Sequence, residues 1–491
     1  MGRRIRLLGV VLIIAFSLVI VQLVNIQFLK APQLDASPGN PRNVSQIFNN
    51  KRGYILAADG SVLAKSVKST QGPYHYMRTY PYGSLFSQIV GYSSLYLGTW
   101  GIEYEYNKYL TSRAQPAQTL GQLLFSPPPK ATDDVTLTVV PSLQALAQRE
   151  LAGRDGAVVV INPATGAIEA MYSNPTFDPN LISSPNVTTE KAADVADSQK
   201  DSEGFSPFGY MAYHESFAPG STFKIVTTSA VYDLKPNLAG FNTPPVSQTA
   251  LPGTNLLFHN YASETCGGTI AQMLPPSCDT GYALLGLQIG AQAMHAEATA
   301  FGFDSVPPLD IPGVAASNFP TPTQLRYNLP GLAYSSIGQQ DVSATALQMA
   351  LVAAGVANGG VVMTPHLMAE IRTDQGAVVT TFQPRPWLKA TSPQTATTVT
   401  SLMRSVVTSP NGTAAGVGFP PQDQVAAKTG TAETGVTNQF TTDWMVAFAP
   451  ATTARVAVAV VLPQQVPSST GAENSGPIIN AMVQAALALG G

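Results

Sequence analysis

The stretch Pro219-Gly220-Ser221-Thr222-Phe223-Lys224 carries the first of three short motifs on which the predicted fold depends. In it a serine precedes a lysine by three residues, directly after a Pro-Gly pair that is typical of a turn. Residues 222–232 are rich in apolar side chains and predict a buried helix. Because residues three apart share a helix face, we expect Lys224 to project beside the Ser221 hydroxyl at the N-terminus of this helix.

The spacing of Ser221 and Lys224 suits nucleophilic catalysis. Burial lowers the pKa of a lysine because its ammonium loses solvation, and a neutral lysine can take the proton of a neighbouring serine. The positive end of the helix would also stabilise a developing anion. Alternatively, Ser221 is an ordinary helix cap and Lys224 a surface lysine, since one such spacing occurs by chance in most long proteins.

The second motif, Ser277-Cys278-Asp279, follows two prolines that favour a rigid entry into a tight loop. We expect the Ser277 hydroxyl to lie within reach of the first motif, where it could relay a proton to a leaving amine. Asp279 is expected to face the same cleft. Alternatively, Ser277 is only the N-cap of a helix.

The third motif, Lys428-Thr429-Gly430-Thr431, is predicted on a strand that borders this cleft. Its lysine would supply positive charge and its threonines hydroxyls, so that a substrate ending in a carboxylate could bind there. Gly430 removes a side chain, which would let a substrate backbone add beside the strand. The backbone N–H groups of Ser221 and Thr431 are expected to form an oxyanion hole. Alternatively, this is a surface edge strand with a protective lysine.

The sequence lacks the patterns of several other enzyme classes. Its histidines form no H-E-x-x-H pair and accompany no G-x-S-x-G turn, and there is no phosphate-binding glycine loop or dinucleotide fingerprint. We therefore expect no metal and no cofactor. The formal net charge of −3 and the 11% of charged residues give no indication of nucleic-acid binding.

The N-terminus predicts a membrane anchor. Arg3, Arg4 and Arg6 precede residues 7–29, which carry no charge. A helix of that length reaches across the hydrocarbon core of a bilayer. The arginines predict that residues 1–6 form a cytoplasmic tail, and that the remainder of a single-pass cell-membrane protein is extracytoplasmic. Alternatively, the apolar stretch is a cleaved signal peptide.

Cys266 and Cys278 are the two cysteines of the chain. Disulfides persist in exported proteins, so we predict that they pair. The bridge would close a loop of about a dozen residues, worth on the order of 3 kcal/mol, and would anchor the second motif. Alternatively, they are two unrelated thiols. Their spacing and lack of companions argue against a metal site.

The chain is predicted to contain a stalk and a β-rich, non-catalytic pedestal over residues 30–134, followed by a catalytic domain over residues 135–491. The catalytic domain is expected to be α+β, with one antiparallel sheet assembled from both ends of the domain. Terminal helices would cover one face of the sheet, and a long helical insertion the other. The expected strands are 156–161, 167–173, 424–431, 443–449 and 454–462, and the terminal helices are 142–151 and 477–489.

With its three motifs in this order the chain resembles the class B penicillin-binding proteins, which are peptidoglycan D,D-transpeptidases. Within that family it is most similar to the actinobacterial penicillin-binding protein A type. The resemblance covers nearly the whole chain. Its further motifs are Arg52-Gly53, Gly101-Ile102-Glu103, Gly338-Gln339-Gln340 and Gly412-Thr413-Ala414.

The resemblance implies a serine β-lactamase/transpeptidase-like domain with a helical subdomain. Ser221 would be acylated by the penultimate D-Ala of a stem peptide, and an amine from a neighbouring stem would then form the cross-link. β-Lactams would acylate the same serine. Proteins of cell-wall synthesis or division are the implied partners. By analogy, Trp444 and Glu433 would line the cleft near the third motif.

Two groups of alternatives remain from the sequence. A D,D-carboxypeptidase or a β-lactamase uses similar motifs, although the pedestal and the anchor favour a transpeptidase. The chain could also be an inactive scaffold, because the second motif of the family usually ends in Asn and this one ends in Asp279. An ionised Asp279 would favour the ammonium form of Lys224 and oppose its action as a base. We therefore expect slower acylation, or acylation at higher pH, than in an Asn version.

Overall fold

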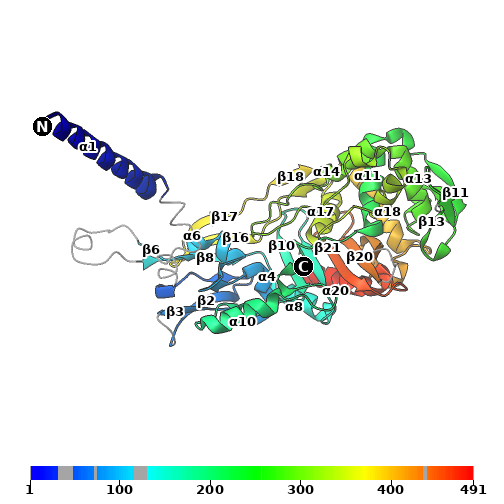
Figure 1. Ribbon diagram of the computed structural model, residues 1–491. Coiled ribbons are helices and arrows are strands. Elements are labelled where there is room, and N and C mark those ends of the chain that lie inside the picture. Colours follow the sequence, from blue (N-terminus) through cyan, green and yellow to red (C-terminus); the bar gives the residue numbers. More distant parts are fainter. Residues whose placement is uncertain are drawn as a thin grey trace.

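The computed structural model describes residues 2–30, 48–70, 74–114, 130–255, 257–434 and 440–489. They form an N-terminal helix, a first module built on a six-stranded sheet, and a larger domain built around a five-stranded sheet (Figure 1). Most of the predicted stalk lies outside the described residues.

Helix α1 (Gly2–Val24) continues into a π-helical turn over Asn25–Leu29. Its span Gly2–Gln27 is long and apolar enough to cross a membrane, and the most apolar 18 residues in it have a mean hydropathy of 3.0. The helix begins at Gly2, so the arginines of the predicted cytoplasmic tail lie within its first turns. Arginine is a good helix former, and nothing in residues 2–6 stops the helix.

The five-stranded sheet of the larger domain has the order β10-β9-β21-β20-β19, with every neighbouring pair antiparallel. It joins the two ends of the domain through the pairing of β9 with β21, as predicted. The central strands consist largely of valine and alanine and are buried on both faces. The strands are β9 (Gly156–Ile161), β10 (Ile168–Asn174), β19 (Ala426–Thr434), β20 (Phe440–Ala449) and β21 (Val456–Gln465).

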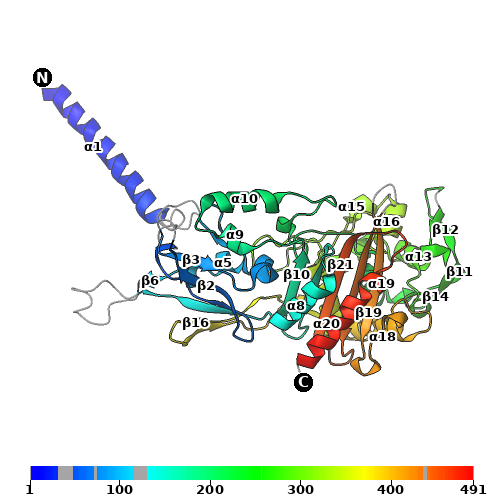
Figure 2. The same ribbon diagram turned by 90° about the horizontal axis from the view of Figure 1, so that it is seen from below.

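Two helices from the ends of the domain, α8 (Pro141–Leu151) and α20 (Gly476–Leu489), pack together on one face of this sheet (Figure 2). On the opposite face the buried helix α17 (Ala346–Ala357) contacts β9, β20 and β21. This layering confirms the predicted α+β arrangement.

The insertion between β10 and β19 holds most of the remaining helices and several short hairpins. Its helices are α9 (Pro179–Ile182), α10 (Val187–Ser198), α11 (Lys224–Leu234), α12 (Ile270–Met273), α13 (Asp279–Ile289), α14 (Ala291–Ala300), α15 (Pro322–Leu325), α16 (Leu329–Ser335), α17 and α18 (Pro393–Thr408). Its paired short strands are β11 (Asn242–Val246) with β14 (Cys266–Thr269), β12 (Gln248–Ala250) with β13 (Leu257–His259), and β15 (Val361–Met363) with β18 (Pro386–Lys389).

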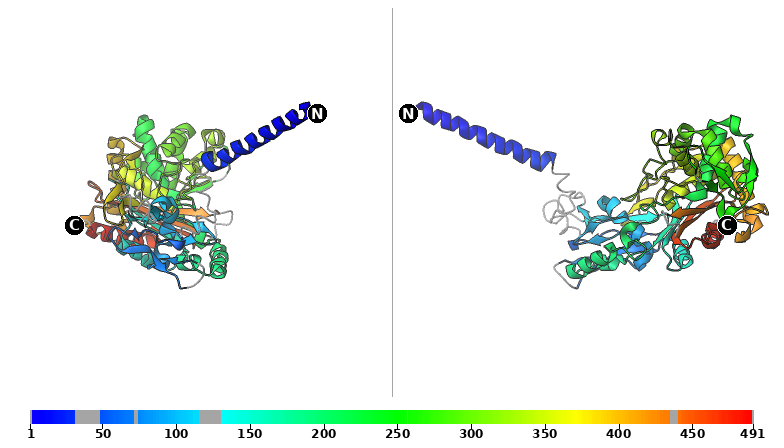
Figure 3. Two further views of the ribbon diagram at one scale, coloured as in Figure 1. Left: turned by 90° about the vertical axis from the view of Figure 1, so that its left-hand side faces the viewer. Right: turned by 45° about the vertical axis from the view of Figure 1, so that its right-hand side comes forward.

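The sheet of the first module has the order β17-β16-β8-β1-β2-β3. Strand β8 (Asp133–Leu137) crosses the boundary predicted at 134/135. Two further strands, β16 (Met368–Thr373) and β17 (Val378–Thr381), come from the middle of the segment assigned to the catalytic domain. The two parts therefore share a sheet and are not consecutive blocks of sequence, as the neighbouring strands β8, β16 and β17 in Figure 1 show. Figure 3 shows the same ribbon from two further sides. The strands from the N-terminal segment are β1 (Ile55–Leu56), β2 (Val62–Lys68) and β3 (Tyr76–Thr79).

A buried ion cluster holds the first module together. Glu103, at the start of α5 (Ile102–Glu105), accepts hydrogen bonds from the guanidinium groups of Arg52 and Arg78. All three side chains are buried. Burial opposes ionisation of Glu103, but the two guanidinium groups outweigh it and hold the pKa of this carboxyl below its usual value.

We predict that Glu103→Gln lowers the stability of the first module by about 3–5 kcal/mol, because it leaves two buried cations without their shared anion. Hydrogen exchange at the backbone amides of β1, β2 and β8 measures this loss. The matched control is Glu105→Gln on the exposed side of the same helix, expected to change stability by no more than about 0.5 kcal/mol. Equal exchange in both variants would contradict the assigned role of the cluster.

Candidate active site

The first motif forms a tight turn that leads into a helix. Ser221 lies in a 3₁₀ turn, η4 (Gly220–Phe223), and α11 begins at Lys224. Because side chains three apart eclipse one another in a 3₁₀ turn, Ser221 and Lys224 point to the same side. The turn is tighter than the regular helix predicted over residues 222–232.

Backbone contacts fix the position of this turn. Gly220 has a positive φ of 53° and donates its N–H to the carbonyl of Gly338 at 2.9 Å. A Cβ at Gly338 would lie 2.2 Å from the carbonyl oxygen of Gly220. The glycine of the Gly338-Gln339-Gln340 motif therefore allows the chain to pass directly behind the serine.

Lys224 reaches from α11 into the second motif. Its Nζ donates to the Ser277 carbonyl at 2.6 Å, to Asp279 Oδ1 at 2.6 Å and to Ser277 Oγ at 3.3 Å. The side chain is fully buried. Burial lowers the pKa of Lys224, while the Asp279 carboxylate acts in the opposite direction.

The Ser277 hydroxyl lies between two amines. Its Oγ accepts a hydrogen bond from Lys428 Nζ at 2.7 Å in addition to the one from Lys224. Burial, and then repulsion by the Lys224 amine, lower the pKa of Lys428 well below its usual value, although Asp279 opposes them. The Ser221 hydroxyl donates to Asp279 Oδ1 at 3.3 Å. The structure thus brings all five predicted catalytic residues into one hydrogen-bonded group.

One contact differs from the sequence-based expectation. In the described part of the chain the hydrogen bond of the Ser221 hydroxyl goes to Asp279, and none joins it to Lys224 Nζ. Both groups share Asp279 Oδ1, so the carboxylate stands between the hydroxyl and the amine as an acceptor for each.

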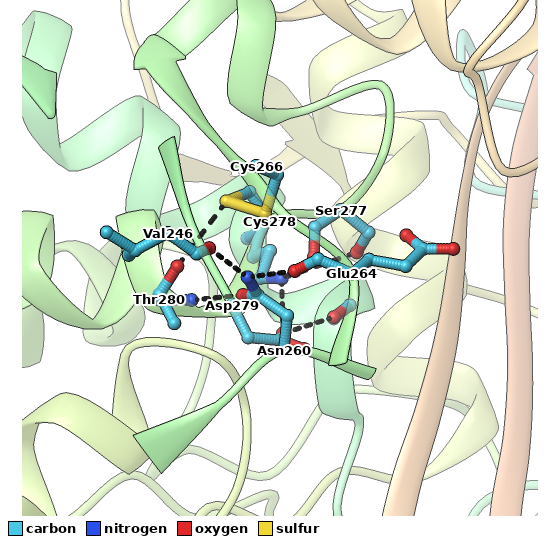
Figure 4. Close-up of a disulfide and its surroundings, with 10 residues drawn as sticks. Val246, Asn260, Glu264, Cys266, Ser277, Cys278, Asp279 and Thr280 are labelled. Atoms are coloured by element: carbon cyan, nitrogen blue, oxygen red, sulfur yellow. Dashed lines mark hydrogen bonds and ion pairs between the residues drawn. A yellow bond between two sulfur atoms is a disulfide. The ribbon is translucent and has the colours of Figure 1, made fainter. Parts of the chain in front are cut away.

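The second motif is held from its other side by a disulfide and by one asparagine (Figure 4). Cys266 and Cys278 are bonded, as predicted, with a Cα–Cα distance of 5.7 Å. The Asn260 side chain accepts from the N–H of Thr280 at 2.8 Å and donates to the carbonyls of Val246 and Glu264, both at 2.8 Å. No pattern in the sequence indicated a role for Asn260, because its partners are backbone groups.

A cavity of about 900 Å³ opens over these side chains. Thr429 Oγ1 in its wall hydrogen-bonds Thr413 Oγ1 at 2.6 Å. Thr413 also donates its backbone N–H to the Pro275 carbonyl at 3.0 Å, so this residue joins the second motif to the third. The predicted residues among the lining are Ser221, Ser277, Asp279, Thr429, Gly430, Thr431 and Glu433.

Trp444 was expected to line the cleft, and this expectation is wrong. Its side chain is fully buried on β20, and its Nε1 donates to the Ala218 carbonyl at 2.9 Å. Ala218 lies just before the nucleophile turn. The indole therefore holds the start of that turn through this hydrogen bond and does not face the cavity.

Close packing inside the protein also requires the absence of a side chain at Gly430. A Cβ at this position would lie 2.8 Å from the Pro219 carbonyl oxygen and 3.1 Å from the Cβ of Trp444. The missing side chain thus makes room for the nucleophile turn. Similarly, a Cβ at Gly220 would lie 3.1 Å from the Thr431 carbonyl oxygen, so the turn and the strand touch where the oxyanion hole is predicted.

Comparisons of the chain with known proteins identify a family and several relatives. Residues 156–484 match the penicillin binding protein transpeptidase domain, and residues 52–126 match the penicillin binding protein A dimerisation domain. The chain is 33% identical to the peptidoglycan D,D-transpeptidase PbpA of Mycolicibacterium smegmatis and 32% identical to that of Mycobacterium tuberculosis, with 99% of each chain covered. The chain belongs to the penicillin-binding protein transpeptidase family.

Solved structures of penicillin-binding proteins share this fold. The penicillin G acyl-enzyme complex of penicillin-binding protein A from M. tuberculosis matches with a TM-score of 0.78 at 31% identity, over 89% of this chain and 100% of that one. These matches confirm the predicted transpeptidase-like domain preceded by a smaller module, and they identify the chain as a serine-type transpeptidase.

We predict that Gly430→Ala slows acylation of this penicillin-binding protein by roughly 10- to 100-fold, because the added methyl displaces the nucleophile turn. The rate of labelling by a fluorescent penicillin measures the effect. Gly416→Ala is the matched control, since a Cβ at Gly416 meets nothing within 4 Å. Equal labelling rates for Gly430→Ala and the wild type would show that the turn does not depend on this contact.

Proposed function

We propose that this chain cross-links peptidoglycan stem peptides through an acyl-enzyme on Ser221. The observation that carries the proposal is the Ser277 hydroxyl placed between the Lys224 and Lys428 amines, 2.7 Å from the second. Transfer of an acyl group needs a base for the nucleophile and an acid for the leaving amine, and this arrangement provides both.

In the first step Ser221 Oγ attacks the carbonyl carbon of the penultimate D-Ala. Lys224, whose pKa is lowered by burial, takes the hydroxyl proton when it is in its neutral form, and the backbone N–H groups of Ser221 and Thr431 stabilise the oxyanion. Ser277 then passes a proton from Lys224 to the leaving nitrogen. The C–N bond breaks, the terminal D-Ala departs, and an ester remains on Ser221.

In the second step an amine of a neighbouring stem peptide attacks this ester. The new amide forms the cross-link, and Ser221 regains its proton through the same group of side chains. The terminal carboxylate of the donor stem would bind at Lys428, Thr429 and Thr431. A β-lactam presents a similar carboxylate and a strained amide, so it would acylate Ser221 and remain bound.

The proposed location is the outer face of the cell membrane. Helix α1 would anchor the chain, and the arginines at positions 3, 4 and 6 would remain on the cytoplasmic side. The disulfide between Cys266 and Cys278 suits an exported domain. Proteins of cell-wall synthesis or division are the proposed partners.

Mass spectrometry tests the nucleophile directly. After treatment of the chain with penicillin G, we predict one covalent adduct on the peptide that contains Ser221, and no adduct in Ser221→Ala. The control is Ser401→Ala on the exposed side of α18, which should be acylated like the wild type. An adduct on another residue would refute the assignment. A wild-type adduct that hydrolysed within minutes would indicate a hydrolase instead of a transpeptidase.

The pH dependence of acylation tests the role of Asp279. Its carboxylate favours the ammonium form of Lys224, so removing the charge lowers the lysine pKa further and leaves more neutral base at low pH. We predict that Asp279→Asn shifts the acid limb of the acylation profile to lower pH. Asp374→Asn, an exposed position in the first module, is the control and should leave the profile unchanged. An unshifted profile in Asp279→Asn would exclude this electrostatic role.

A further inference from the structure

A buried carboxylate outside the three motifs lies beside the proposed substrate strand. Asp443 is on β20, directly opposite Thr431 of β19 in the sheet register. Its side chain is completely buried. The proposed mechanism does not use this group, and burying a carboxylate is costly unless hydrogen bonds compensate for the lost solvation.

Most hydrogen-bond partners of Asp443 come from one segment. Its Oδ2 accepts from Ser469 Oγ and from Asn474 Nδ2, both at 2.8 Å, and its Oδ1 accepts from Thr441 Oγ1 at 3.4 Å. The backbone carbonyl of Asp443 accepts from Ser475 Oγ at 3.0 Å. Three of these four donors lie in residues 469–475, which include the short helix α19 (Gly471–Asn474). The carboxylate therefore fastens this segment to the sheet.

The fastened segment forms part of the cavity wall. Thr470, Gly471 and Ala472 line the cavity beside Thr431. The segment rests on the strands without intervening side chains, since a Cβ at Gly471 would lie 2.1 Å from the Trp444 carbonyl oxygen. Its position is thus set by the hydrogen bonds to Asp443 and by direct contact with the backbone of the strands.

One hydrogen bond connects the segment 469–475 with Thr431, a residue of the proposed substrate site. The backbone N–H of Gly471 donates to Thr431 Oγ1 at 3.2 Å. A hydroxyl that accepts a hydrogen bond from a fixed N–H keeps its own proton for donation in another direction. The Thr431 hydroxyl is then free to donate to a substrate carboxylate in the cavity.

We propose that Asp443 is a positioning residue that holds residues 469–475 against β19 and so orients the Thr431 hydroxyl toward the carboxylate of the substrate. This inference rests on the proposed function, because it requires a substrate carboxylate at Thr431. An apolar residue of similar size could fill the same space, but it would leave the donors of Ser469 and Asn474 without their acceptor.

A double-mutant cycle on the full chain tests the proposal. Asp443→Asn keeps the shape of the side chain but no longer accepts at both oxygens, and Thr431→Val removes the hydroxyl. The acylation rate of each variant by penicillin G, resolved into a binding constant and a first-order rate, is compared with the wild type. Each single change should weaken acylation about tenfold, mainly through binding, as expected for one lost hydrogen bond to a charged group.

The double variant separates positioning from general structural damage. If Asp443 acts through Thr431, the double variant should lose about tenfold in total, whereas two independent effects would multiply to about 100-fold. Ser469→Ala, which removes one donor and leaves the carboxylate in place, should give a smaller loss of about threefold. Asp423→Asn, in the η8 turn (Pro421–Asp423) before β19, is the control expected to behave as wild type.

The outcomes are distinct. Multiplicative losses, or normal acylation in Asp443→Asn, would overturn the positioning role while leaving the proposed function intact. If Asp443→Asn fails to fold, unchanged binding in Ser469→Ala would overturn it instead. Absence of any wild-type adduct on Ser221 would overturn the proposed function and this inference together.

Discussion

The burial of two lysine amines around one serine hydroxyl is the constraint on which the rest of this structure depends. Lys224 and Lys428 are both fully buried, and both donate to Ser277 Oγ. Two ammonium groups so close together and so far from water would repel one another, so the site favours the loss of a proton from at least one. Asp279 is the anion that moderates this repulsion, and it is also the acceptor for the Ser221 hydroxyl.

Such a group forms only if segments distant in the sequence meet closely, and the fold achieves this through backbone contacts. The nucleophile turn lies between Gly338 on one side and Gly430 on the other. The Trp444 indole donates a hydrogen bond to the carbonyl of Ala218, just before the turn. The loop of the second motif is held by the disulfide at Cys278 and by Asn260. These supports lie mostly outside the three motifs, yet they determine where the reactive atoms stand.

The sequence predicted those parts of the fold that have a local pattern. Strand β9 was predicted to the residue, and the three motifs were expected in one cleft. Several other contacts between distant segments were missed. No periodicity indicates that β16 pairs with β8, and an aromatic residue such as Trp444 looks the same whether it faces a cavity or supports a turn. Asn260 and Asp443 were missed for the same reason, because their importance comes from partners that the sequence does not place beside them. Thr413 was recognised as part of a family motif, but its contact with Thr429 was not predicted.

The protonation of the two amines tests the central claim most directly. Nuclear magnetic resonance of the chain labelled at the lysine Cε carbons follows each titration, and Lys→Arg variants at positions 224 and 428 assign the two signals. The account predicts that both lysines lose their protons at lower pH than the other lysines of the chain, because burial lowers the pKa of each. Lys428 should be displaced furthest, because repulsion by Lys224 lowers its pKa as well. Two signals that titrated together with those of the exposed lysines would contradict it.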